Sequence, residues 1–565
     1  MKILRLLLFF YTPFFAQHNY PKADFKSPLS IPMQLSGNFG ELRNNHFHSG
    51  LDYKTNQKEG LPVLAAASGY VSRIKISTFG YGKALYITHP NGYTTVYGHL
   101  KQANGTIDAY LKKAHYDQKS YEVELFPLAK ELQVKQGDTI AWSGNTGGSE
   151  GPHLHFEIRD SQTENIINPL FFGFDAMLKD TKKPFVANVL AYPITPKSTV
   201  NQSNVPIVLH VSLQKDGTFI SEQLRVNGSV GFGIAANDYD NVSYNTNGIY
   251  KVQCYRNGTP NFGYQFDDFS FAETRYVNAL LDYARYKKTK QRVQKLFQKN
   301  PNDWSLLQAD NAQGIYTPLP NVNQVARIEV SDFHANTTSI QIPIEYAADS
   351  VVIPSPQLNS KYLIKANQDA IFEEGNFTVF FPAKTFYDDF YLRISAAKDT
   401  LSIHEDLVPA HTNFQLSCVD SMRAYPNKTY LALIEKGNTI YSPTKFSKNT
   451  YKTYVKKLGT YVLQTDTIAP TIKLPRPLEG RWMSNENQLS FEITDSGSGI
   501  KSYNGYLNSN WVLFEYDYKS DQLIHQFDPA FLLEGKNELK LIVTDHVGNS
   551  AIFESTFFRS QKNKP

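Results

Sequence analysis

The sequence predicts an all-β-dominated fold: a small antiparallel β domain with a helical insertion, followed by two or three β-sandwich modules of immunoglobulin-like type. At 565 residues the chain is too long for one hydrophobic core. Its 13% aromatic share, mostly Tyr and Phe, favours strands. Short β-patterned runs separated by turn residues recur along it. The expected segments are a leader at 1–16, the first domain at 28–175, and modules at 180–347, 348–465 and 466–560.

The first residues have the layout of a secretory signal peptide. Lys2 and Arg5 form a short basic region, Leu6 to Phe15 is a largely apolar run, and cleavage is expected after Ala16. A single-span anchor is the alternative, but the run is far shorter than the roughly 20 apolar residues that cross a bilayer. We therefore expect an exported protein without a transmembrane segment after cleavage. Periplasmic, envelope-associated and secreted locations stay open.

The charge and the cysteines exclude other classes of protein. A net charge of +4 is nearly balanced for this length, so nothing indicates a nucleic-acid partner or a membrane surface. The two cysteines, Cys254 and Cys418, fall in separate predicted modules. They do not form a disulfide framework. A bridge between them stays open, and two buried free thiols are the expectation.

The first domain, residues 28–175, consists of short strands and glycine-rich turns. Apolar strand material at 61–76 breaks at Gly69, and the turn Pro90-Asn91-Gly92 is a strong hairpin signal. Further strands are expected at 83–89, 93–100, 139–142 and 153–159, with a glycine-rich loop at 144–151.

An insertion at 107–132 interrupts this β pattern and has helical character around Tyr110 to His115. A loop that covers a neighbouring site and a plain surface insertion are both compatible with it, because loops tolerate added length at little energetic cost.

The modules carry a weak internal repeat. The pattern D-T-x-x-P occurs at 180–184 and again at 466–470, each time before alternating strand patterns. Related turns close the two segments at 330–336 and 543–549. Two β-sandwiches are the natural interpretation, with a third between them whose strands include 377–381 and 390–394.

The first module contains a basic, helical excursion, Ala272 to Lys299. The spacing of Tyr276, Leu280 and Tyr283 predicts one packed helix face with the lysines outside. Contact of the stretch from Arg275 to Lys299 with an anionic envelope polymer is the weaker alternative.

Candidate metal ligands cluster in the first domain. In His153-Leu154-His155 the two imidazoles lie on one face of a strand, because strand side chains alternate. His48 and Asp52 add an imidazole and a carboxylate, both zinc ligands, although this pair taken alone is compatible with a surface ion pair. His48, Asp52 and His155 make three ligands and leave one tetrahedral position open, as in catalytic zinc sites.

His99, at the end of a strand, is a further acid/base candidate beside His153. Taken alone, it is equally compatible with a partly buried histidine whose hydrogen bonds are satisfied.

Several motifs occur in a fixed order: HSGLD at 48–52, GYG at 80–82, ITHPNGYTTVYGHL at 87–100, VKQGDTIAWSGNTGGSEGPHLHFEIRD at 134–160 and NPL at 168–170. Together they resemble the M23 family of zinc metallopeptidases, of the LytM and lysostaphin type. The resemblance covers residues 35–175, about a quarter of the chain. It departs from the family at Lys83, where Asn is common, and in the longer helical insertion after His99.

The resemblance implies an antiparallel β fold with a groove and one zinc ion held by His48, Asp52 and His155. It places His99 and His153 beside the metal-bound water, one as general base and the other on the oxyanion or leaving amine, without deciding which. It further implies an endopeptidase that cleaves peptide cross-links between peptidoglycan stem peptides. The bond that is cleaved stays open.

Two other functions are carried as alternatives. One is a non-enzymatic LytM-like regulator of cell-wall amidases, which the intact ligand set disfavours. The other is an envelope adhesion or scaffold protein that binds an envelope partner through its C-terminal modules, since sandwich modules serve many functions.

Overall fold

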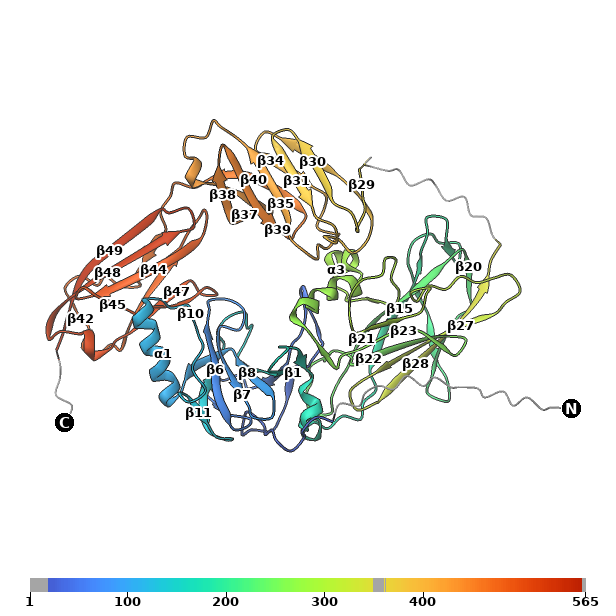
Figure 1. Ribbon diagram of the computed structural model, residues 1–565, viewed down its shortest axis with the longest axis horizontal. Coiled ribbons are helices and arrows are strands. Elements are labelled where there is room, and N and C mark those ends of the chain that lie inside the picture. Colours follow the sequence, from blue (N-terminus) through green and yellow to red (C-terminus); the bar gives the residue numbers. More distant parts are fainter. Residues whose placement is uncertain (1–18, 349–359, 361, 561–565) are drawn as a thin grey trace.

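The computed structural model describes residues 19–348, 360 and 362–560 (Figure 1). The predicted leader lies outside these ranges. Within them, no helix is both long and apolar enough to cross a membrane. The described chain is dominated by strands with a few short helices, which confirms the predicted fold class.

The first domain is built on one antiparallel sheet. Its strands follow the order β1-β4-β13-β8-β7-β6-β10, with the bounds β1 Leu35–Gly37, β4 Leu51–Lys54, β13 His153–Asp160, β8 Tyr93–Gly98, β7 Lys83–Thr88, β6 Gly69–Ile76 and β10 Val123–Leu125. A smaller sheet, β5-β12-β9, packs beside it; its strands are β5 Pro62–Leu64, β12 Thr139–Ser143 and β9 Leu100–Ala103. The remaining short strands are β2 Leu42–Arg43, β3 His46–Phe47, β11 Gln133–Val134 and β14 Ile166–Ile167.

The predicted helical segment of the insertion is α1, Gly105–Gln118. Ile107, Leu111 and His115 face the core at i, i+4 and i+8, the spacing of one helix face. The helix ends where Lys119 adopts a left-handed conformation.

The next module has two facing sheets. One follows β17-β15-β21-β25 and the other β16-β20-β28-β27-β22-β23-β26, with the bounds β15 Phe185–Pro193, β16 Thr199–Val200, β17 Ile207–Leu209, β20 Leu224–Asn227, β21 Val230–Asn237, β22 Lys251–Arg256, β23 Thr259–Gln265, β25 Gln294–Lys295, β26 Leu307–Ala309, β27 Gln324–Ser331 and β28 Thr337–Tyr346. The hairpin β18 Val211–Leu213 and β19 Phe219–Ser221 extends the second sheet.

The helical excursion expected over 272–299 is present, but it is broken into short elements. The segment forms a 3₁₀ turn at Phe271–Tyr276, then α2 at Val277–Leu280 and α3 at Tyr283–Thr289, before it enters β25. Leu281 is extended and ends α2, and the side chain of Asp282 accepts a hydrogen bond from the backbone N–H of Arg285 to begin α3. Tyr276 and Leu280 are buried as expected.

The first domain and this module share one hydrophobic core that runs from Phe25 to Ile344. Strand β14 pairs with β24 (Asp268–Phe269) across the boundary. The ring of Phe47 stacks on Trp304, with ring centroids 5.3 Å apart. The first domain and the module that follows it are therefore stabilised as one folding unit, although the sequence predicts two separate modules.

The last two modules each have their own core. The third segment has the sheets β30-β31-β35-β39-β38 and β33-β34-β40-β36-β37, and the last has β41-β43-β47-β46 and β42-β49-β48-β44-β45. Their strands are β29 Tyr362–Ile364, β30 Ala370–Glu374, β31 Phe377–Phe381, β32 Phe390–Leu392, β33 Ile394–Ala397, β34 Thr400–Ile403, β35 Phe414–Val419, β36 Thr429–Glu435, β37 Asn438–Tyr441, β38 Thr444–Ser447, β39 Thr450–Val455, β40 Gly459–Thr465, β41 Thr471–Lys473, β42 Arg481–Trp482, β43 Gln488–Thr494, β44 Ile500–Leu507, β45 Asn510–Val512, β46 Glu515–Asp517, β47 Gln522–Gln526, β48 Gly535–Asp545 and β49 Ser550–Arg559.

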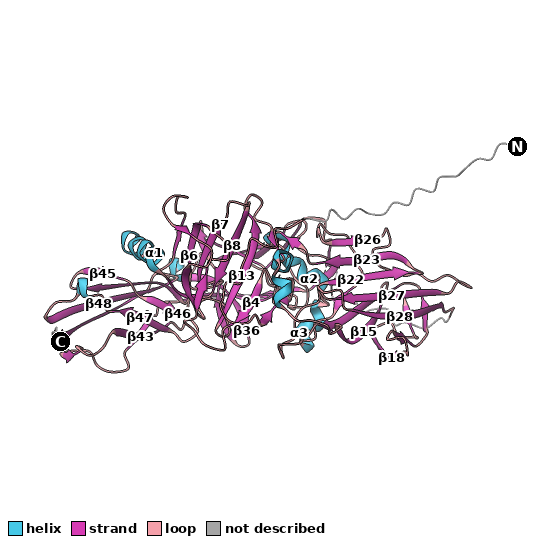
Figure 2. Ribbon diagram, turned by 90° about the horizontal axis from the view of Figure 1, so that it is seen from below, coloured by secondary structure: helices cyan, strands magenta, loops and turns pink. Residues whose placement is uncertain are grey.

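The chain closes into a ring, in which the last module returns to α1 of the first domain (Figure 1); seen from below, the ring is flattened (Figure 2). Tyr116 on α1 stacks on Phe531 at 5.1 Å and meets Trp511 at 5.4 Å between ring centroids. Lys112 and Asp528 form an ion pair of 2.6 Å beside them. The insertion therefore serves as a docking surface for the last module.

Both cysteines are buried free thiols, in agreement with the expectation. Cys254 lies on β22 and Cys418 on β35, in different sheets.

The shared core predicts how truncated chains behave. A chain of residues 17–347 should unfold in one cooperative transition, whereas residues 17–180 should aggregate. The shorter chain uncovers Phe39, Phe47 and Ile166, all buried against the next module. Each large apolar group that loses its packing costs roughly 2–5 kcal/mol, against a total stability of about 5–15 kcal/mol. Size-exclusion chromatography and thermal circular dichroism measure this. A monodisperse, cooperatively melting 17–180 chain would contradict the shared core.

Candidate metal centre

Strand pairing places the candidate ligands opposite one another. In the antiparallel pair of β4 and β13, Asp52 lies directly across from His155. His48 precedes β4 in a tight loop that includes Gly50. A Cβ at Gly50 would lie 2.3 Å from the carbonyl oxygen of Phe156, so only glycine allows this close approach.

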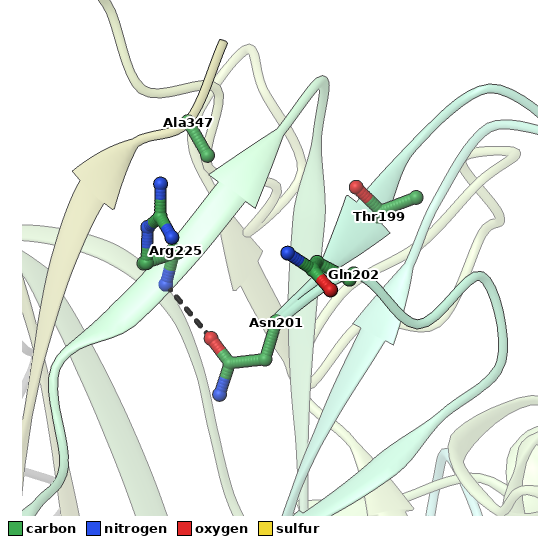
Figure 3. A pocket seen from close by; sticks show the side chains of 5 residues that line it. All are labelled: Thr199, Asn201, Gln202, Arg225 and Ala347. Atoms are coloured by element: carbon green, nitrogen blue, oxygen red, sulfur yellow. Dashed lines mark hydrogen bonds between the residues drawn. The ribbon is translucent and has the colours of Figure 1, made fainter. Parts of the chain in front are cut away.

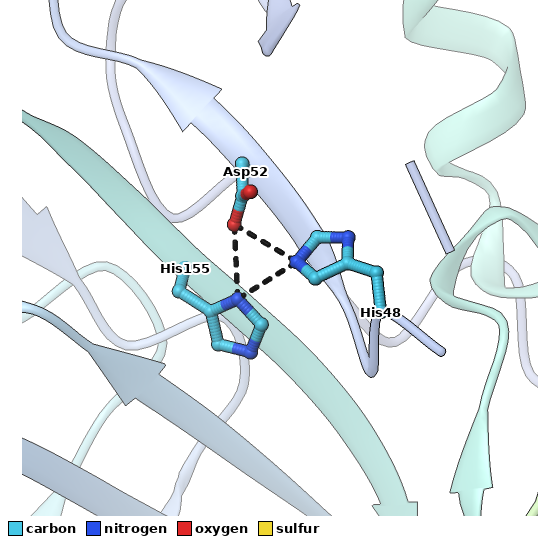
Figure 4. A group of neighbouring side chains, drawn as sticks. All are labelled: His48, Asp52 and His155. Atoms are coloured by element: carbon cyan, nitrogen blue, oxygen red, sulfur yellow. Dashed lines mark hydrogen bonds and ion pairs between the residues drawn. The ribbon is translucent and has the colours of Figure 1, made fainter. Parts of the chain in front are cut away.

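The three predicted ligands converge on one point (Figure 4). His48 Nε2 lies 3.1 Å from Asp52 Oδ1 and 3.1 Å from His155 Nδ1. His155 Nδ1 lies 2.9 Å from the same Asp52 oxygen. All three side chains are buried.

The partners of the other ring nitrogens fix the histidine tautomers. His48 Nδ1 lies 2.8 Å from the backbone oxygen of Asn38, and His155 Nε2 lies 2.8 Å from a carboxylate oxygen of Glu157. Carbonyl and carboxylate oxygens only accept hydrogen bonds, so these ring nitrogens carry the hydrogens. The lone pairs of His48 Nε2 and His155 Nδ1 are then available to bind a metal. Each ring is oriented by a hydrogen bond through its other nitrogen, as is typical of zinc-binding histidines.

The donor set fits a single divalent cation. Zinc bonds of about 2.0–2.2 Å place tetrahedral ligand atoms roughly 3.4 Å apart, close to the separations found here. Two imidazole nitrogens and one carboxylate oxygen are a combination that zinc accepts, and three protein ligands leave a fourth position open. His48, Asp52 and His155 are therefore the residues that could hold the metal.

His99 and His153 lie beside this triangle, with their ring centroids 4.7 Å apart. His153 Nδ1 contacts the backbone oxygen of Gly151 at 2.8 Å, and His99 Nδ1 contacts that of Thr146 at 2.8 Å. By the same acceptor argument, both rings keep an available lone pair on Nε2. His153 Nε2 lies 3.5 Å from Asp52 Oδ1. His99 has φ +58°, a left-handed conformation uncommon for a residue with a side chain and frequent at functional sites.

Burial and neighbouring charges shift the pKa values in opposite directions. Burial opposes ionisation of Asp52, but His48 and the neighbouring rings of His153 and His155 hold its pKa well below the usual range. Burial also disfavours the charged form of His155, yet Asp52 and Glu157 raise its pKa to about 9. A metal ion would take the place of the proton that these carboxylates otherwise hold on His155.

Glu157 and Arg159 belong to the site, although the sequence interpretation did not name them. Residues 153, 155, 157 and 159 alternate along β13, so they share one face, which is the signal that could have identified them. Arg159 Nη2 lies 2.6 Å from the fully buried Glu157 carboxylate. That carboxylate also accepts from the hydroxyl of Ser49 at 2.7 Å. Burial opposes its ionisation, but Arg159 and His155 lower the pKa of Glu157.

Arg43 and Tyr81 were missed as well. Arg43 Nη2 donates to Asp52 Oδ2 at 2.9 Å and fixes the carboxylate from the side opposite the histidines. The ring of Tyr81, within the GYG motif, stacks on His155 at 5.0 Å. Nothing in the local sequence around Arg43 signals its role, because the contact arises from chain folding.

The ligand atoms face a groove of about 1600 Å³. The module that follows the first domain forms one wall, and its groove-lining residues are Tyr244, Asn245, Phe271, Thr274, Tyr286 and Arg292. The insertion contributes Glu122 to the lining, while α1 packs against the last module instead. The insertion therefore does not form a loop that covers the site.

A second cavity, of about 180 Å³, lies in the neighbouring module (Figure 3). Its lining is Thr199, Asn201, Gln202, Arg225 and Ala347. The backbone N–H of Arg225 donates to the side-chain oxygen of Asn201 at 2.9 Å. These five residues include no carboxylate, imidazole or thiol, so they form no set for acid/base or metal chemistry.

The burial of His99 predicts its titration. Burial and the neighbouring His153 and His155 lower the pKa of His99 to about 3. Its folded pKa is thus below the unfolded value near 6.5, so protonation opposes folding and the ring should stay neutral from pH 8 to pH 5. Histidine ring NMR signals, assigned with a His99→Gln variant, measure this. Titration of the His99 signal near pH 6 would contradict it.

Two segments of the chain match known domain families. Residues 46–169 match the model of Peptidase family M23, and residues 361–466 match that of the Zu5-like domain. An uncharacterized metalloprotease of Haemophilus influenzae is 35% identical over 150 residues, which cover 25% of this chain and 26% of that protein. The DD-carboxypeptidase/endopeptidase Mpg of Neisseria meningitidis serogroup B is 36% identical over 146 residues, covering 24% and 27%.

The peptidoglycan DD-endopeptidase ShyC of Vibrio cholerae is 33% identical over 143 residues, covering 24% of this chain and 27% of that protein. The match thus spans about a quarter of the length of these relatives. Among solved structures, the catalytic domain of lysostaphin from Staphylococcus simulans aligns with 25% of this chain and 91% of its own, at 24% identity and a TM-score of 0.19. Residues 46–169 are a domain of peptidase family M23, which confirms the resemblance found in the sequence.

Proposed function

We propose that this protein is an exported, zinc-dependent endopeptidase that hydrolyses peptide cross-links of bacterial peptidoglycan. The observation that carries the proposal is the convergence of three oriented ligand atoms at the groove of an M23 domain. Relatives named peptidoglycan DD-endopeptidase and DD-carboxypeptidase/endopeptidase support the substrate class. Such a substrate also supports a location in the periplasm or cell envelope.

In this proposal His48, Asp52 and His155 hold the zinc ion. Zinc bound there would polarise the scissile carbonyl and make a coordinated water acidic. Asn38, Glu157 and Arg43 hold the three ligands in the orientation described above. Such hydrogen bonds typically contribute 10–100-fold to metal affinity or activity.

We assign the general base to His153. A base works best with a pKa near the working pH, and the pKa of about 3 makes His99 too weak. His153 Nε2 can take a proton, and it lies 3.5 Å from an oxygen of Asp52. The imidazolium can then return the proton to the leaving amine. Neutral His99 accepts a hydrogen bond at Nε2 and so orients the attacking water.

The groove lining suits an anionic, extended peptide. Lys75 and Arg292 contribute positive charge along it, while Arg43 and Arg73 are paired with carboxylates. Peptide stems that carry free carboxylates would be attracted by these cations. The glycine-rich loop at 144–151 borders the groove with little side-chain bulk, which leaves room for a slim chain.

The ligand assignment predicts that loss of zinc binding and loss of hydrolysis can be separated by substitution. His155→Ala and Asp52→Ala should each abolish zinc binding and hydrolysis together, because each removes one of three ligands. His153→Ala should retain about one zinc ion per chain and lose turnover by roughly 10²–10⁴-fold, the usual contribution of a general base. Zinc content by mass spectrometry and release of muropeptides by chromatography measure both effects.

His115→Ala provides a control, since His115 lies on the buried face of α1, away from the groove. Hydrolysis retained in His155→Ala would refute the zinc mechanism. Zinc bound by the parent without any muropeptide release would favour the non-enzymatic regulator.

The wall supplied by the neighbouring module predicts a binding effect. Arg292→Ala should raise KM several-fold and leave kcat nearly unchanged, because Arg292 lines the groove and lies away from the ligand triangle. Lys288→Ala, exposed on α3 and outside the groove lining, is the matched control and should change neither. Steady-state kinetics on soluble cross-linked muropeptides measure this. An equal fall in kcat and kcat/KM in Arg292→Ala would contradict a role in substrate binding alone.

A further inference from the structure

The repeated motif of the modules forms a second kind of site, outside the M23 domain. In each copy the Asp of D-T-x-x-P lies beside the Asp of the closing turn: Asp180 beside Asp332, and Asp466 beside Asp545. A third aspartate joins each pair, Asp238 in the first copy and Asp495 in the second.

The strand register makes the third aspartates equivalent. Phe185, five residues after Asp180, pairs with Asn237, the residue before Asp238. Thr471, five residues after Asp466, pairs with Thr494, the residue before Asp495. The two clusters are therefore built from the same three positions of the two modules.

The closing turns agree in detail. The Asp332 carboxylate accepts from the backbone and side-chain nitrogens of Asn336 at 2.9 and 2.6 Å. The Asp545 carboxylate accepts from the same atoms of Asn549 at 2.8 and 2.6 Å. The asparagine side chain also donates to the backbone oxygen of Asp180 at 3.4 Å in one copy and of Asp466 at 3.1 Å in the other.

Each cluster contains a buried oxygen without a partner. Asp238 is 5% exposed, and its Oδ1 makes no hydrogen bond. Asp180 and Asp332 lie close enough for their charges to act on the Asp238 carboxylate. Oδ1 of Asp495, the equivalent atom, also lacks a partner, and a carboxylate oxygen of Asp495 lies within 4.8 Å of ligand atoms of Asp466 and Asp545. A buried carboxylate oxygen without a donor is unfavourable unless a cation compensates it.

We propose that each cluster binds one calcium ion. In the second cluster the ligand atoms of Asp466, Asp495 and Asp545 all lie within 4.8 Å of one another, and all are carboxylate oxygens. Calcium takes six to eight oxygen ligands in flexible geometry, which carboxylates, backbone carbonyls and water supply. The first cluster also includes the imidazole of His334, but Val547 stands at that position in the second. The donors that both clusters share are oxygens, which favours calcium over zinc.

Both clusters lie at joints of the ring. Near the first, His334 Nε2 lies 3.5 Å from the backbone oxygen of Asp175, at the end of the M23 domain. Near the second, the backbone N–H of Asp466 donates to the Lys428 oxygen of the Zu5-like domain at 2.9 Å. The aspartates of each cluster all belong to the module that begins at the joint, so a bound ion would fix the start of that module, at Asp180 or Asp466, to its closing turn.

The test uses the full chain saturated with zinc, so that the M23 centre does not compete. The parent should bind two calcium ions in equilibrium dialysis, Asp238→Asn and Asp495→Asn should each bind one, and the double variant none. Asn keeps the size of the side chain and removes its charge. Asp216→Asn combined with Asp521→Asn, two exposed positions in the same modules, is the matched control and should bind two.

Thermal unfolding separates lost binding from misfolding. In EDTA the double variant should melt at or above the Tm of the parent, because substitution relieves repulsion between carboxylates. Calcium should raise the Tm of the parent and leave that of the double variant unchanged. Absence of calcium binding by the parent, two ions in the double variant, or an equal calcium-induced rise in both would overturn the proposal. Displacement of the bound calcium by equimolar zinc would overturn the choice of metal.

Discussion

The pairing of β13 with β4 is the constraint on which the candidate centre depends. It places His155 across from Asp52, and a slip of β13 by one residue would turn His155 to the opposite face, away from Asp52. The close approach at Gly50 then brings His48 to the same point. Since the candidate ligands come from two strands and a short loop of one sheet, little conformational entropy would be lost if a metal bound there.

A second requirement is the buried charge of Glu157, which no water reaches. Arg159 at 2.6 Å and the His155 ring at 2.8 Å compensate it. Removing one partner of such a pair typically costs 3–5 kcal/mol, because the other charge stays buried. The same carboxylate fixes the tautomer of His155. Stability of the sheet and readiness of the metal ligands are therefore linked through one side chain.

Much of the fold and of the candidate centre could be predicted from the sequence, because the signals for them are local. Strands, the hairpin at 90–92 and α1 follow from periodicity and turn residues, and the three ligands follow from residue types known to bind zinc. The break of the expected helix at Leu281 was not readable, because its spacing fits a continuous helix equally well. Arg43 and the core shared with the next module were also hidden, since both arise from contacts between segments far apart in the chain.

Contacts with the last module explain both departures from the family pattern, Lys83 and the longer helical insertion. Lys83, where Asn is common, forms an ion pair of 2.7 Å with Glu515, and α1 stacks on Phe531 through Tyr116. Both partners belong to the last module. In addition, Lys519 of that module donates to the backbone oxygen of Ser149 at 3.2 Å, on the glycine-rich loop beside the groove. The sequence differences thus adapt an M23 domain to hold a distant part of its own chain against the rim of its groove.

This arrangement gives the modules a role that extends beyond spacing. One wall of the groove comes from the second segment, and one rim loop is contacted by the last, so the shape offered to a substrate depends on the whole ring. The peptidase fold alone would leave that wall open. Because the ring closes through a few aromatic contacts and ion pairs, its geometry rests on the joints between modules, where the two aspartate clusters lie.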